Sequence, residues 1–127
     1  MRTVLLIVLA LIACACGGSD DEPLEPADYA SQAEVIAGVP GAVAGESGGD
    51  LARIGEAYAA AAEALRELTA PAVLADAGVE LAAAFDEAAA AHAAAAETGE
   101  PEAVVHAADA IERVTAARQA LARAVPT

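Results

Sequence analysis

The second half of the chain alternates apolar and polar residues with the period of an α-helix. From residue 51 onward, apolar positions recur every three or four residues, which places them on one face of a helix. Asp50 is suited to cap the first of these helices, and Pro71 ends it. The apolar stripe of this helix comprises Leu51, Ile54, Tyr58, Ala61, Leu65 and Leu68.

Two further helices are predicted with the same spacing. The second runs from about Pro71 to Glu97 and ends at Thr98-Gly99, and Pro101 begins the third. The stripe of the second helix comprises Leu74, Gly78, Leu81, Phe85, Ala88, His92 and Ala95. The stripe of the third comprises Val104, Ala107, Ile111, Val114, Arg118, Leu121 and Val125.

Antiparallel packing of these helices places large residues mostly opposite small ones. Leu65 then faces Gly78, and Tyr58 meets Phe85 as the largest pair of anchors. Alanine accounts for 40 of the 127 residues, so the core is thin. The pattern predicts an all-α fold, an alanine-rich antiparallel three-helix bundle within a domain spanning residues 28–127.

A short additional N-terminal helix is predicted from Asp28 to Gly38. Val39-Pro40 and the glycine-rich stretch Gly41–Gly49 are expected to break it. This helix either lies across the bundle as a fourth helix or docks loosely. Its apolar face is formed by Tyr29, Ala33 and Ile36.

Residues 1–13 have the pattern of a secretory signal peptide. Arg2 supplies a positive charge, and Val4–Ala13 is an unbroken apolar run. This run is too short to cross a bilayer, which takes about 20 residues. Residues 14–27 are rich in Gly, Asp, Glu and Pro, so we expect a flexible acidic linker after the signal.

The segment Leu11-Ile12-Ala13-Cys14 resembles the lipobox of bacterial lipoproteins. In that family the cysteine thiol receives a diacylglycerol, and a dedicated peptidase cuts before the cysteine. The resemblance implies that Cys14 is the lipidated first residue of the mature protein. It also implies the outer membrane in a host with two membranes, because Ala15 replaces the aspartate that retains such proteins.

Three alternatives to lipidation of Cys14 remain open. Ala13-Cys14-Ala15 also fits ordinary signal cleavage, which would release a soluble protein beginning at Cys16. Cys16 is a second candidate for lipidation, with a poorer match upstream. Both cysteines could instead be structural, although two cysteines one residue apart make a strained disulfide.

Charge excludes several classes of partner and activity. After the signal peptide, 20 acidic residues face five arginines, a side-chain charge of −15 that makes nucleic acid and anionic lipid poor partners. The chain has no lysine, which excludes a Walker A lysine or a Schiff base. The acidic residues are expected to form solvated helix faces, with Arg118 extending from the stripe to a carboxylate.

Two sets of residues carry weak signals for chemistry. Gly45–Gly49 matches the G-x-S-x-G pattern of serine hydrolases, but no strand precedes Ser47, so we interpret it as a loop. His92 and His106 lie seven residues either side of Gly99, where Glu97 or Glu102 could complete a zinc or copper site. The alternative places His92 at a hydrated bundle end and His106 in solvent, and we expect no metal, cofactor or catalytic residue.

These patterns predict a lipid-anchored cell-envelope protein, facing the extracytoplasmic side, with a non-enzymatic structural or binding role. The alternative is an extracytoplasmic carrier of a small ligand or metal, using the His92 end or an apolar groove beside the short first helix. A protein partner or self-association is also compatible with the narrow apolar stripes.

Overall fold

A computed structural model describes residues 22–127, and all of the regular structure in this range is helical. The predicted signal peptide, Cys14 and residues 15–21 of the predicted linker lie outside the described residues. Four α-helices and one short 3₁₀-helix follow one another along this part of the chain. They are α2 (Pro26–Ser47), α3 (Leu51–Glu67), η1 (Ala72–Leu74), α4 (Ala75–Thr98) and α5 (Pro101–Ala124).

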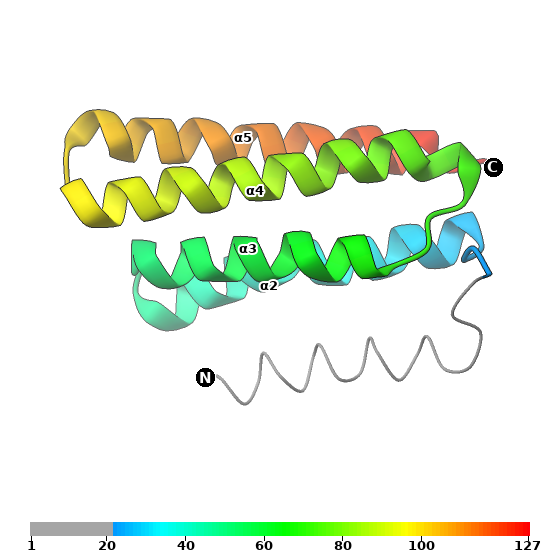
Figure 1. The fold of residues 1–127 in the computed structure, drawn as a ribbon, viewed down its shortest axis with the longest axis horizontal. Coiled ribbons are helices and arrows are strands. Elements are labelled where there is room, and N and C mark those ends of the chain that lie inside the picture. The colour runs from blue at the N-terminus through cyan, green and yellow to red at the C-terminus, as the bar shows by residue number, and fades with distance from the viewer. Residues whose placement is uncertain (1–21) are drawn as a thin grey trace.

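The four helices form two antiparallel hairpins that pack through their inner members (Figure 1). Helix α2 lies against α3, α3 against α4, and α4 against α5. The fourth side, between α2 and α5, has few contacts. The fold is therefore a four-helix arrangement with three well-packed sides and one open side.

The first helix is twice as long as the sequence pattern predicts. Helix α2 begins at Pro26 and continues through Pro40 to Ser47, so the prediction of a short helix followed by a Gly41–Gly49 loop is wrong. A proline inside a helix removes one backbone hydrogen bond and costs about 3 kcal/mol. Pro40 is buried on the same face as Tyr29 and Ile36, and this burial against the bundle offsets the cost.

The predicted helix boundaries after residue 50 are confirmed in most cases. The Asp50 side chain accepts hydrogen bonds from the backbone N–H groups of Ala52 and Arg53, at 3.1 and 3.4 Å. Gly99 has φ +66° and ends α4, a left-handed conformation that glycine adopts without strain. Helix α4 begins later than predicted, because residues 72–74 form the 3₁₀ turn after Pro71.

The predicted pair of aromatic anchors is present in the core. The Tyr58 and Phe85 ring centroids are 6.2 Å apart, and both side chains are buried. Much of the remaining core is alanine, together with leucines from α3, η1, α4 and α5. This contact confirms the predicted register between α3 and α4.

One face of α5 differs from the predicted stripe. Ile111 and Val104 are 40% and 43% exposed, whereas Ala110, outside the predicted stripe, is fully buried. Helix α5 packs mainly against α4 and has few contacts with α2, so only a narrow face of α5 is buried. The predicted burial of these two residues is therefore wrong.

Gly78 is required by a contact that the sequence did not reveal. A Cβ atom at this position would overlap the hydroxyl group of Tyr29, which reaches it from α2. The sequence pattern predicts that Gly78 faces Leu65 of α3. In the structure, the nearest atom to a Cβ at Gly78 would be the hydroxyl oxygen of Tyr29 on α2.

Replacing Gly78 with alanine should lower the free energy of unfolding by about 1–3 kcal/mol, because the added methyl group overlaps the Tyr29 hydroxyl. Tyr29→Phe in the same chain should recover part of this loss. Gly38→Ala is the matched control, since Gly38 is exposed in α2 with open space around it, and should stabilise by roughly 0.5–1 kcal/mol. Urea denaturation of the wild type and these three variants measures the differences, and equal effects at Gly78 and Gly38 would contradict the contact.

Candidate functional site

The G-x-S-x-G segment forms a helix end and a turn. Ser47 is the last residue of α2, and its Oγ accepts a hydrogen bond from the backbone N–H of Asp50 at 3.2 Å. Gly48 and Gly49 have positive φ values and make the turn into α3. This serine stabilises the connection between two helices, and no strand of residues 22–127 supports it.

His92 lies between α3 and α4, with 2% of its surface exposed. Its Nδ1 is 2.7 Å from the carbonyl oxygen of Ala88, and because a carbonyl only accepts, Nδ1 carries the proton. The imidazole packs on the Tyr58 ring with a centroid distance of 5.3 Å. The expectation of a hydrated His92 is therefore wrong, and the ring belongs to the core.

His106 is exposed on α5. The antiparallel hairpin does bring α4 and α5 together, but His92 is directed toward α3 and is buried there. Among residues 22–127, no three His, Cys, Asp or Glu side chains are close enough to hold a metal ion. The geometry of the described residues thus gives no support to zinc or copper binding by His92 and His106 with Glu97 or Glu102.

Arg118 extends from α5 to the carboxylate of Glu34 on α2. Its Nε and one terminal nitrogen lie 3.3 and 2.6 Å from the two carboxylate oxygens. This ion pair crosses the open side of the fold, and it lowers the pKa of Glu34 mainly through the hydrogen bond from Arg118. The predicted extension of Arg118 to a carboxylate is confirmed, and Glu34 is its partner.

Two further ion pairs join neighbouring helices at the surface. Arg66 of α3 contacts Asp86 of α4 at 2.5 Å, and Arg113 of α5 contacts Glu87 of α4 at 2.6 Å. All four side chains are about half exposed, so water screens each pair and its contribution to stability is small. These charged side chains therefore form exposed contacts between neighbouring helices.

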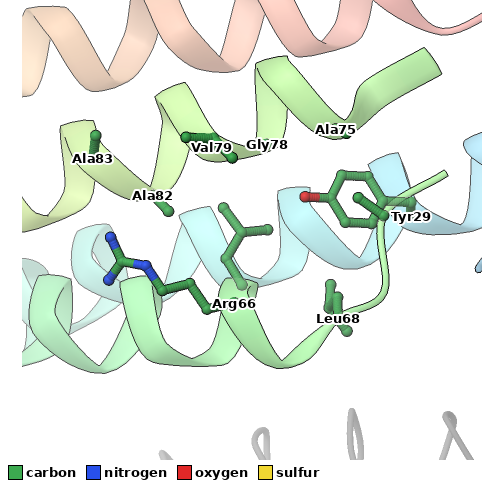
Figure 2. Close-up of a pocket in the computed structure, with 10 residues that line it drawn as sticks. Tyr29, Arg66, Leu68, Ala75, Gly78, Val79, Ala82 and Ala83 are labelled. Carbon is green, nitrogen blue, oxygen red and sulfur yellow. The ribbon is translucent and has the colours of Figure 1, made fainter. Parts of the chain in front are cut away.

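A pocket of about 310 Å³ lies between α3 and α4, next to the start of α2 (Figure 2). Leu65 and Leu68 line one wall, and Ala75, Gly78 and Ala82 line the other. The Tyr29 hydroxyl points toward Gly78, while Arg66 extends along α3 on the opposite side of the pocket. This is an apolar groove beside the first helix, as the alternative function requires. Val79 and Ala83 of α4 and Ala70 complete its lining.

Comparison of the chain with protein-family models, with curated proteins and with solved structures gives no match. Within residues 22–127, no helix is both long and apolar enough to cross a bilayer.

Removing the two histidines should have very different effects. His92→Ala should lower the free energy of unfolding by about 2–4 kcal/mol, because it deletes a buried ring. His106→Ala should change it by less than about 0.5 kcal/mol. Thermal unfolding with and without added zinc measures both effects, and we expect zinc to leave the wild-type midpoint unchanged. A zinc-dependent stabilisation lost in both variants would instead establish the metal site.

The Glu34–Arg118 pair should contribute to stability only where Glu34 is ionised. The folded-state pKa of Glu34 is lowered, so its contribution is present at neutral pH and is lost as the pH falls through the acidic range. Glu34→Gln should therefore destabilise by up to about 1 kcal/mol at pH 7 and by less near pH 3, since the carboxylate is 55% exposed.

Glu112→Gln, at an exposed position of α5, removes the same charge and is the matched control for Glu34→Gln. It should be neutral or slightly stabilising at pH 7, because the chain is strongly acidic. Urea denaturation at both pH values measures the two variants, and an identical response would rule out a specific role of the ion pair.

Proposed function

We propose that this protein is a lipid-anchored component of the cell envelope with a non-enzymatic structural or binding role. The observation that carries the proposal is Leu11-Ile12-Ala13-Cys14, placed directly after an apolar run and a positive charge. Cys14 would carry the lipid, and the helical domain would face the extracytoplasmic side. In a host with two membranes, Ala15 favours the outer membrane.

The arrangement of the chain ends is compatible with such an anchor. Nine residues separate Cys14 from Leu24, whose backbone is hydrogen-bonded to the domain, and the predicted linker of this length would have a root-mean-square span of roughly 17 Å. The backbone N–H of Leu24 donates to the carbonyl oxygen of Thr69 at 3.0 Å, which ties the start of the domain to the connection after α3. One end of the bundle would therefore lie closest to the membrane.

The side chains of the domain support a structural or binding role. Its ion pairs are exposed contacts between helices, Ser47 stabilises a turn, and His92 is part of the core. The acidic surface favours repulsion from anionic headgroups and from nucleic acid. The domain would thus be held near the membrane by its lipid while its own surface remains free for a protein partner, a small ligand or a second copy.

Substituting Cys14 with alanine in the native host should move the protein out of the membrane fraction, because the thiol that receives the lipid is lost. Cys16→Ala is the matched control and should leave the protein membrane-bound. Mass analysis of the wild type should give an N-terminal Cys14 with added acyl mass. Membrane retention of the Cys14→Ala protein, or an unmodified N-terminus at Cys16, would overturn the proposal.

A further inference from the structure

The Tyr29 hydroxyl is the accessible end of an otherwise buried side chain, and it has no hydrogen-bond partner among residues 22–127. Tyr29 is 2% exposed, and no side-chain hydrogen bond joins it to any other residue of 22–127. Burial also raises the pKa of this phenol, so it keeps its proton and can donate. No fully buried side-chain polar atom of residues 22–127 lacks a partner, so the Tyr29 hydroxyl is accessible beside the pocket that it lines and can donate to a molecule there.

The hydroxyl borders the pocket between α3 and α4 and points toward Gly78 (Figure 2). An alanine at position 78 would overlap the oxygen, so the glycine makes room for the hydroxyl at the wall of the pocket. The hydroxyl is therefore held, by the packing of its own ring, at the edge of a space that another molecule can enter.

The size and lining of the pocket define the molecule that it suits. Its volume of about 310 Å³ is at the lower end of ligand pockets, which run from about 300 to 1,000 Å³. A dry cavity of about 150 Å³ already accepts benzene. The walls are leucine, valine, alanine and glycine, so the body of the ligand must be apolar and compact.

The polar groups of the pocket favour an uncharged ligand. Arg66 is the one charged residue that lines it, and its guanidinium is already paired with Asp86, with Glu63 also nearby. An anionic ligand would have to compete with Asp86 within a strongly acidic chain. A neutral carbonyl group instead accepts the proton of the Tyr29 hydroxyl without displacing an existing ion pair.

We propose that this pocket binds a small, uncharged, mostly apolar molecule of about one ring, whose single carbonyl-type acceptor receives a hydrogen bond from Tyr29. The inference rests on the binding role proposed above, but not on the anchor. Uptake of a probe by the purified chain and retention in the membrane fraction are separate measurements, so either can fail without the other.

Acetophenone is a suitable probe, because it combines one apolar ring with one carbonyl group. The full chain contains two tyrosines, so tyrosine labelled with ¹³C in the ring gives two sets of NMR signals. Titration should shift the Tyr29 signals in a saturable manner and leave those of Tyr58 in place. No saturable shift, or equal shifts of both tyrosines, would overturn the proposal.

Two related compounds separate the hydrogen bond from simple apolar binding. Tyr29→Phe should weaken acetophenone binding about three- to tenfold and leave the binding of ethylbenzene, which has no acceptor, unchanged. Tyr58→Phe, the other tyrosine, should affect neither compound. Benzoate should bind more weakly than acetophenone. Equal affinities of wild type and Tyr29→Phe for acetophenone, or tighter binding of benzoate, would contradict the assignment.

A second variant tests the pocket without altering the core. Val79 is 69% exposed at the pocket rim, so Val79→Trp should obstruct entry and weaken acetophenone binding at least tenfold while the fold is retained. Val105→Trp, at a 60% exposed position of α5 that does not line the pocket, is its matched control and should bind like the wild type. Equal binding by the two variants would show that the probe occupies another place.

Discussion

The fold depends on close approach between helices that have few large side chains. Alanine in the core lets the helices pack near one another but buries little apolar area per residue. The few large side chains of the core, such as Tyr58, Phe85 and Leu81, must therefore pack closely against one another. Glycine at 55 and 78 extends the same constraint, because a methyl group at either position would contact an aromatic residue or the backbone of α4.

The sequence predicted the elements whose signals are local. The spacing of apolar residues predicted α3, the body of α4, and α5. The preference of aspartate for helix starts and of glycine for helix ends predicted the roles of Asp50 and Gly99. Helix α2 was predicted too short, because proline and glycine were judged by their local propensities. Burial of Pro40 on the face of Tyr29 and Ile36 outweighs those propensities, and a single sequence does not show that tertiary contact.

The candidate site was less predictable for a related reason. A groove beside the first helix could be expected, but not its residues, because Gly78 was assigned to a contact with α3 and the phenol of Tyr29 arrives from α2. His92 was recognised as part of a stripe, yet its burial depends on how closely Gly55 lets α3 approach. Cys14, in contrast, needs no tertiary information, since the processing signal resides in adjacent residues.

Four antiparallel helices are an even number, so the chain returns to the end of the bundle at which it entered. The start of α2 and the C-terminus lie together there, whereas the turns at Gly48-Gly49 and Gly99 lie at the opposite end (Figure 1). In the proposed orientation, a tag fused after Thr127 would sit in the crowded zone beside the headgroups. An epitope inserted at either glycine turn would project away from the membrane surface.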